Sequence, residues 1–254
     1  MEEKKENWEK LSDTLDICVT DAHKFGTDAF LLSHFAGARR VDRCADLGTG
    51  CGIVALLWYR RREEGPRHCT CVDIQEQAVK QLCRTVERAG LGDKIRPLCR
   101  DLRELGDEIE AGSLDLITCN PPYKTPGTGV MSREVSDQIA RHEVMCGLDE
   151  LCAAAERYLK FSGRLCLCQR PERLCDVICA MRDAGIEPKR LRFVVQRPGC
   201  PPWLFLIEGK KGAKPFLQVE RDLIIEGPGG FSREVLDIYH KKENKPQGAK
   251  EAGK

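Results

Sequence analysis

From Val41 onward, short apolar runs alternate with segments whose apolar residues recur at helical spacing. The first predicted strand ends at Asp46-Leu47. Four more predicted strands span 69–74, 95–99, 114–119 and 165–168. The segments predicted to be helices span 52–62, 76–89, 149–159 and 172–184. Strands that alternate with helices form a parallel sheet with helices on both faces. The chain is therefore predicted to adopt an α/β fold.

The alternation stops near the C-terminus. Arg190–Gln196 and Trp203–Glu208 are both strand-like, and only residues 197–202 separate them. So short a link favours an antiparallel pair, because a parallel crossover needs a dozen or more residues. The prediction is a Rossmann-like seven-stranded sheet of five parallel strands plus a C-terminal antiparallel hairpin. One domain is expected over 14–240, with a flexible N-terminus at 1–13 and a disordered Lys-rich tail at 241–254.

A glycine-rich turn follows the first predicted strand, in the sequence Asp46-Leu47-Gly48-Thr49-Gly50-Cys51-Gly52. Glycine permits a tight turn and a close approach of the backbone to a ligand. The dinucleotide fingerprint is Gly-x-Gly-x-x-Gly, which places a pyrophosphate on a helix N-terminus. The spacing here is Gly-x-Gly-x-Gly, which suits a cofactor with a carboxylate and no phosphate. S-adenosylmethionine is therefore the predicted cofactor, and NAD is the alternative.

Acidic residues stand at the ends of successive predicted strands. Asp73 ends the second strand and is expected to accept hydrogen bonds from both ribose hydroxyls, as in dinucleotide folds. Asp101 follows the third strand and can accept from the adenine amino group. Asp46 lies beside the first glycine and can help to hold the methionine ammonium. The carboxyl ends of parallel strands meet at one edge of the sheet, so these side chains are expected to form one site.

The fourth predicted strand, 114–119, leads into Asn120-Pro121-Pro122-Tyr123. Each proline lacks an N–H and holds the preceding residue in extended geometry. The Asn120 side chain and the nearby carbonyls are thus rigid acceptors, and Tyr123 adds a flat ring. Such a site suits a planar group that carries an NH2, either the exocyclic amine of a nucleobase or the side-chain amide of glutamine. These four residues are the predicted catalytic residues.

Residues 14–36 precede the first predicted strand of the sheet. Thr27 or Asp28 can cap the helix that begins with Ala29-Phe30. Two interpretations stay open for this segment: an ordinary capped helix, or a lid over a cofactor in the cleft.

The overall composition excludes several classes of protein. The formal net charge is +1, so a nucleic-acid-binding surface has to be local. Met1–Lys10 is charged and no apolar run approaches the ~20 residues that span a bilayer, so neither a signal peptide nor a membrane partner is expected. The 15 cysteines then indicate a reducing, cytoplasmic location. Cys69-x-Cys71 and Cys166-x-Cys168 are too closely spaced for zinc pairs, so no metal is expected.

With these residues in hand, the chain resembles the class I S-adenosylmethionine-dependent methyltransferases. The Asn120–Tyr123 turn is similar to that of enzymes that methylate a planar nitrogen, on adenine N6 or on glutamine N5. Five segments together resemble the bacterial valine-tRNA adenine-N6-methyltransferases: 25–32, 46–52, 120–123, 141–143 and 170–174. The resemblance covers roughly residues 15–240 and implies methylation of the adenine next to the anticodon. The expected cofactor-binding residues are Phe25, Gly26, Thr27, Asp46, Gly48, Gly50, Gly52, Asp73, Ile74, Asp101, Leu102 and Asn120.

RNA is the expected partner, and a monomer is favoured. The expected substrate-binding residues are Tyr123, Lys124, Arg141 and His142. Residues 186–254 hold 14 Lys and Arg against 9 Asp and Glu, which points to a basic surface in the C-terminal third. Three alternatives stay open: a protein-glutamine N5-methyltransferase, a DNA adenine-N6-methyltransferase, and a cofactor-binding RNA chaperone without activity. The short segment before the first strand argues against the glutamine enzymes, which carry a helical N-terminal domain.

Overall fold

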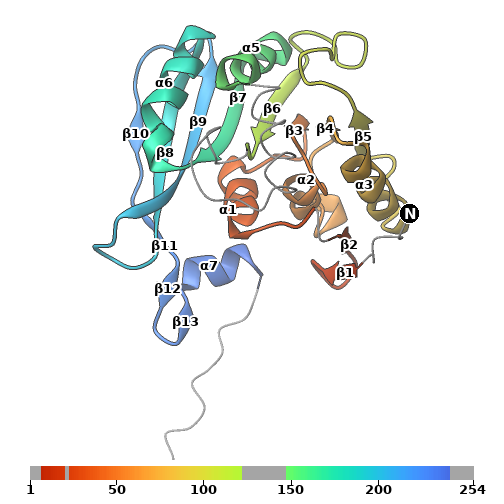
Figure 1. Ribbon diagram of the computed structural model, residues 1–254, viewed down its shortest axis with the longest axis horizontal. Coiled ribbons are helices and arrows are strands. Elements are labelled where there is room, and N and C mark those ends of the chain that lie inside the picture. Colours follow the sequence, from red (N-terminus) through yellow and green to blue (C-terminus); the bar gives the residue numbers. More distant parts are fainter. Residues whose placement is uncertain (1–6, 21–22, 122–146, 241–254) are drawn as a thin grey trace, which may run out of the picture.

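The computed structural model describes residues 7–20, 23–121 and 147–240. Its centre is a nine-stranded sheet with the order β10-β8-β9-β7-β6-β3-β4-β5, in which β11 also pairs with β8 (Figure 1). Antiparallel pairing joins β9 to both β7 and β8. The five mutually parallel strands are β3 (Arg43–Leu47), β4 (His68–Asp73), β5 (Ile95–Cys99), β6 (Leu114–Cys119) and β7 (Leu159–Gln169). They confirm the predicted parallel sheet that ends in an antiparallel hairpin.

The hairpin strands and the strand count differ from the prediction in detail. The hairpin consists of β8 (Ile186–Val195) and β9 (Pro202–Lys211), and both strands are longer than the sequence pattern indicated. Two short strands, β10 (Gln218–Val219) and β11 (Leu223–Ile224), run parallel to β8 and widen the sheet. A two-residue strand has no periodicity from which it can be predicted, so the expected count of seven was too low.

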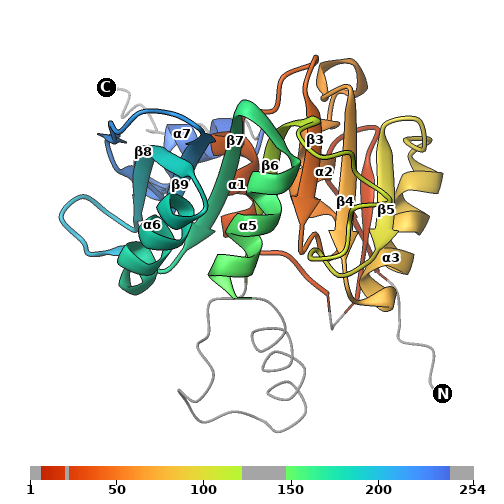
Figure 2. The ribbon, with the colours of Figure 1, turned by 90° about the horizontal axis from the view of Figure 1, so that it is seen from above.

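Helices cover both faces of the sheet, as predicted. One layer holds α1 (Thr27–Ala36), α2 (Ile53–Trp58), α3 (Glu76–Arg88) and α7 (Arg233–Ile238). The other layer holds α5 (Leu148–Tyr158) and α6 (Leu174–Asp183), which stand in front of the sheet in Figure 2. Short 3-10 turns follow α2 and precede α6, at Arg62–Glu64 and Pro171–Arg173, so both α-helices are shorter than predicted. No helix in the described ranges has the length and apolar character to cross a membrane.

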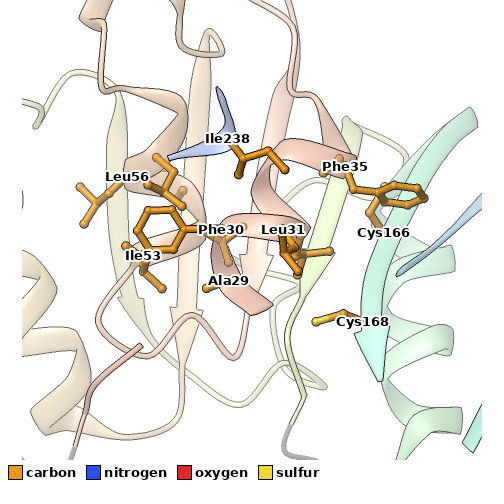
Figure 3. Close-up of a cluster of buried hydrophobic side chains, with 14 of the residues drawn as sticks. Ala29, Phe30, Leu31, Phe35, Ile53, Leu56, Cys166, Cys168 and Ile238 are labelled. Carbon is orange, nitrogen blue, oxygen red and sulfur yellow. The ribbon is translucent and has the colours of Figure 1, made fainter. Parts of the chain in front are cut away.

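The paired cysteines follow the alternation of strand residues between the two faces. In β7, Leu165 and Leu167 pack toward α5 and α6, whereas Cys166 and Cys168 pack toward α1. Figure 3 shows both cysteines in the cluster that α1 completes. Side chains two positions apart on a strand share a face. The single residue between the two cysteines therefore reflects burial of both on the same face of the sheet. Each cysteine acts there as a small apolar side chain.

A hairpin of β1 (Asn7–Lys10) and β2 (Asp16–Val19) precedes α1. This differs from the expectation of a flexible N-terminus over 1–13. The contacts that hold it come from α3: the Thr85 hydroxyl accepts from the Cys18 N–H at 3.0 Å, and Gln81 donates to the Cys18 carbonyl at 2.7 Å. The chain also forms a small hairpin of β12 (Glu226–Gly227) and β13 (Gly230–Phe231) before α7. The predicted tail at 241–254 lies outside the described residues.

Candidate active site

Three of the predicted site residues, Gly48, Asp73 and Asn120, come together where the strand order reverses. From β3 the chain proceeds to β4 and β5 on one side and returns to β6 on the other. Leu47 of β3 is paired with both Val72 and Cys119, so the residues that follow these three positions are neighbours at the carboxyl edge. Ligands of open α/β sheets bind at such a switch point. The topology therefore brings Gly48, Asp73 and Asn120 to one edge.

The glycine-rich turn leaves open space on its outer side. Gly48, Gly50 and Gly52 have φ values of 67°, 55° and 84°, which favour glycine. A Cβ at Gly48 or Gly50 would have no atom of the described residues within 4 Å, whereas one at Gly52 would lie 2.3 Å from Leu82. The first two glycines thus keep the turn accessible to a ligand, and the third lets α2 pack against α3.

Asp73 connects this turn to the end of β4. Its Oδ2 accepts from the Gly50 N–H at 2.8 Å, and its Oδ1 accepts from the Gln75 N–H at 2.9 Å. A carboxylate has about four lone-pair sites, so each oxygen keeps capacity for one further donor. The position and this remaining capacity fit the predicted pair of ribose hydroxyls.

Asp46 is a buried carboxyl group at the base of the turn. Its two oxygens accept from the hydroxyls of Thr49 and Thr118, each at 2.6 Å. Burial raises the pKa of Asp46 to about 6, and it outweighs the two hydroxyl donors, which lower the pKa. The nearby Asp73 carboxylate raises it further. The sequence identified Asp46 but gave no sign of its two threonine partners.

Asp101 lies two residues beyond β5, beside Leu102, which packs against the α5–α6 core. The Asp101 Oδ1 accepts from the backbone N–H and the Nε of Arg103, both at 2.9 Å. The hydrogen bond from Arg103 holds the pKa of Asp101 below its usual value. A cofactor amine at this position would share the carboxylate with Arg103. Ile74, after β4, leaves 37% of its surface exposed, an apolar face suited to a flat ring.

The Asn120 amide is held at both ends. Its Nδ2 donates to the Asp28 Oδ2 at 3.0 Å, and its Oδ1 accepts from the Cys168 Sγ at 3.1 Å. Sequence reasoning treated Asp28 only as a cap for α1, and it treated Cys168 only as core. The N-cap of α1 is instead Gly26, with no side-chain cap, which leaves the Asp28 carboxylate available to Asn120.

The remaining predicted residues are placed as follows. Phe25, Gly26 and Thr27 line a cavity beside the N-terminus of α1, to which Asp46, the glycines of the turn, Asp73 and Asn120 do not contribute. Pro121 follows Asn120 at the edge of the described residues. Pro122, Tyr123, Lys124, Arg141 and His142 lie outside them.

Two basic residues of the C-terminal third are bound to carboxylates. Arg190 donates to Glu208 at 3.0 Å and to Glu220 at 2.7 Å. Arg192 makes two hydrogen bonds to Glu234, at 2.6 and 2.8 Å. These arginines join β8 to its neighbours, so both already have carboxylate partners within the protein.

Comparison with known proteins identifies the family. Residues 20–178 match the methyltransferase small domain family. The chain belongs to this family. Membership makes the protein a methyltransferase, and it confirms S-adenosylmethionine as the cofactor predicted from the glycine-rich turn. No group of three or more potential metal ligands occurs in the part of the chain that the structure describes.

Relatives and solved structures agree with the family. The methyltransferase is 29% identical over 232 residues to a tRNA1(Val) (adenine(37)-N6)-methyltransferase of Parabacteroides distasonis, covering 87% of this chain and 92% of the relative. An equally named protein of Bacteroides fragilis is 27% identical, covering 73% and 76%. A predicted O-methyltransferase from Agrobacterium tumefaciens has a similar fold, with a TM-score of 0.68, 20% identity and coverage of 84% and 95%.

Proposed function

We propose that this methyltransferase methylates N6 of an adenine in RNA, and that the adenine lies next to the anticodon of a valine tRNA. The observation that carries the proposal is the Asn120 amide, held in place next to the glycine-rich turn at the switch point. The names of the relatives, at 27–29% identity, support tRNA over DNA or protein as the substrate.

The residues of the carboxyl edge fit the cofactor. Gly48 and Gly50 leave room over the turn, Asp73 keeps lone pairs for two hydroxyls, and Ile74 offers an apolar face. S-adenosylmethionine supplies a methyl group on a positively charged sulfur when it is bound. Asp46 adds negative charge below the turn when it is ionised, which favours a bound cation.

Asn120 acts on the amine that receives the methyl group. Its Oδ1 and the Pro121 carbonyl accept the two N6 hydrogens, which draws the nitrogen lone pair out of conjugation with the ring. The Asn120 Nδ2 is occupied by Asp28, so the amide presents its oxygen rather than its nitrogen to the substrate. Alignment of this kind supplies ~7–11 kcal/mol of barrier reduction. No general base is needed, because the nitrogen loses its proton readily once it is methylated.

The adenine has to leave its stack to reach Asn120. We propose that Tyr123 stacks on the extruded base, a contact worth ~1–3 kcal/mol, and that Lys124, Arg141 and His142 contact the RNA. The proposed location is the cytoplasm. It is supported by the cysteines of the described residues, which are free thiols and nine of which are buried, as is usual in a reducing compartment.

The test compares three substrates under the same conditions. Purified protein and S-adenosylmethionine with a labelled methyl group are incubated with unmodified valine tRNA, with duplex DNA, and with a bacterial release factor. We expect label in the tRNA alone, recovered as N6-methyladenosine after digestion. Label in the release factor or in the DNA would replace the proposed substrate with one of the other planar nitrogens.

A further inference from the structure

A cavity of about 370 Å3 lies among α1, the end of α2, β1 and the end of α7. Small-molecule sites measure roughly 300–1,000 Å3, so the cavity is large enough for a ligand. The lining residues used in the argument are Lys10, Phe25, Thr27, Phe30, Arg60 and Tyr239. None of the residues at the carboxyl edge of β3, β4 or β6 contributes to it.

Arg60 is a buried cation without an acidic partner in the described part of the chain. The residue is 8% exposed, and its Nη1 donates to the Ile238 carbonyl at 2.8 Å. Its Nε has no hydrogen-bond partner among the residues that the structure describes. Burial lowers the pKa of Arg60 to about 10, so the group remains positively charged at neutral pH. Buried guanidinium groups normally pair with a carboxylate or a phosphate, so this one lacks the anion that its environment calls for.

The N-terminus of α1 adds further donors to the same cavity. Helix α1 has ten residues, and its N-cap, Gly26, provides no side-chain acceptor for the first turn. Gly26 and Thr27 both line the cavity. The first N–H groups of a helix lack partners within the helix and carry partial positive charge, which favours an anion.

Aromatic rings form one wall beside these donors. The Phe30 ring stacks on the Tyr239 ring at a centroid distance of 4.2 Å. The Arg60 guanidinium lies over the same Phe30 ring, 5.0 Å from the Phe30 centroid. Phe25 is tilted against Phe30 at 5.9 Å and is only partly buried. The cavity thus combines a cation, helix amides and an available aromatic ring, which are the elements of a nucleotide site.

The cavity adjoins the Asn120 site through two consecutive residues. The Tyr239 hydroxyl donates to the Thr27 Oγ1 at 3.0 Å, at the cavity. The next residue, Asp28, accepts from Asn120. Thr27 at the cavity and Asp28 at Asn120 are thus consecutive residues of α1, so a ligand longer than one nucleotide can contact both places.

We propose that this cavity binds the phosphate of a nucleotide that neighbours the target adenine in the RNA. Arg60 Nε and the first amides of α1 are the donors, Phe25 contacts the attached base, and Lys10 lies at the rim. Glu9 also lines the cavity, and Lys10 is paired with Asp13 at 2.9 Å, so Arg60 is the cation that faces the ligand. The proposal rests on the proposed function, because it requires an RNA substrate. The cofactor carboxylate is the other anion with matching chemistry, and the test separates the two.

The test measures the affinity of valine tRNA and of S-adenosylmethionine for Arg60→Gln and for Arg61→Gln. Arg61 is the matched control, because it is adjacent in sequence, 68% exposed and paired only with Glu64 among the described residues. We expect Arg60→Gln to weaken tRNA binding about 10- to 100-fold and to reduce the log–log salt slope by about 1. Cofactor affinity should be unchanged, and Arg61→Gln should bind tRNA like the wild type.

A second pair of variants keeps the test informative if Arg60→Gln unfolds. Lys10→Glu reverses a charge at the cavity, and Lys80→Glu does so on α3; the two side chains are 65% and 64% exposed. Only Lys10→Glu should weaken tRNA binding. The phosphate site would be overturned if Arg60→Gln bound tRNA as tightly as Arg61→Gln, and Lys10→Glu as tightly as Lys80→Glu. If Arg60→Gln weakened only cofactor binding, the anion would be the cofactor carboxylate. A wild-type protein that methylates no tRNA would instead overturn the proposed function.

Discussion

The position of the Asn120 amide depends on two residues that lie far from it in the sequence. Asp28 accepts from the amide nitrogen and Cys168 donates to the oxygen, so the side chain cannot turn freely. A preorganised acceptor stabilises the transition state more than a mobile one does, because it does not have to reorient when charge develops on the substrate. Asp28 is therefore a positioning residue, and its contribution can be measured separately from that of Asn120.

Asp28→Ala should reduce the rate of methyl transfer without preventing cofactor binding. The lost hydrogen bond involves a charged acceptor and is worth ~1.5–3 kcal/mol, which corresponds to about a 10- to 100-fold decrease in kcat. Single-turnover kinetics with tRNA gives the rate, and calorimetry gives the cofactor affinity. Asp28→Asn, which keeps an acceptor, should retain more activity. An unchanged rate for Asp28→Ala would show that Asn120 is positioned by other contacts.

The raised pKa of Asp46 predicts a pH-dependent stability in the absence of cofactor. The pKa is about 6 in the folded protein, against an ordinary value of 3.8. The folded state therefore binds a proton between these values that the unfolded state has lost, and the stability from this group is lost as the pH rises through 6. A shift of about two pKa units corresponds to ~3 kcal/mol.

Asp46→Asn removes the titrating group but keeps its shape. Between pH 7 and pH 5, the wild type should gain free energy of unfolding relative to this variant, as measured by urea denaturation. A difference between the two proteins that stays constant across this range would mean that Asp46 does not titrate there.

At the scale of elements, we propose that the turn between β3 and α2 determines where the cofactor can approach. Gly48 and Gly112 have φ values of 67° and 65°, and within the described ranges no atom lies closer than 4 Å to a Cβ placed on either. Alanine at either position therefore carries the same backbone strain, ~1–2 kcal/mol. Only Gly48 lies at the switch point, so the two substitutions separate strain from ligand approach.

Gly48→Ala should weaken binding of S-adenosylmethionine about 10- to 100-fold, because the added methyl group occupies the space through which the ligand approaches. Both substitutions should lower the melting temperature by similar amounts, because they add the same backbone strain. Gly112→Ala should leave the affinity for S-adenosylmethionine unchanged. Isothermal titration calorimetry and thermal unfolding together check both values. Equal cofactor affinities would place the cofactor away from the turn.

The order of the elements could be predicted because their ends carry strong signals. Asp46-Leu47-Gly48 ends a strand and Asn120-Pro121 ends another, and both boundaries agree with β3 and β6. The hairpin of β1 and β2 gave no such signal, because β1 is exposed throughout and depends on distant contacts to α3. Local sequence determines where an element ends, but not which exposed segment will pair.

At the scale of the whole molecule, the site combines residues that only the sheet topology brings together. Asp28 and Asn120 are 92 positions apart, and Cys168 lies another 48 positions away. The sequence indicated the residues that follow the strands, since parallel strands share a carboxyl edge. It could not indicate partners contributed by α1 and β7, nor the pairing of Arg190 with Glu208, because those contacts depend on how α1 packs on the sheet and on the register of β8 against β9.

The most direct test of the account is single-turnover methylation of valine tRNA by the wild type and by Asn120→Ala. S-adenosylmethionine with a trideuterated methyl group provides the label, and mass spectrometry of digested nucleosides identifies the product. The account predicts labelled N6-methyladenosine with the wild type and a rate ~10²–10³-fold lower with Asn120→Ala, while the affinities for cofactor and tRNA stay near those of the wild type. Equal rates for the two proteins, or label in a nucleoside other than N6-methyladenosine, would contradict it.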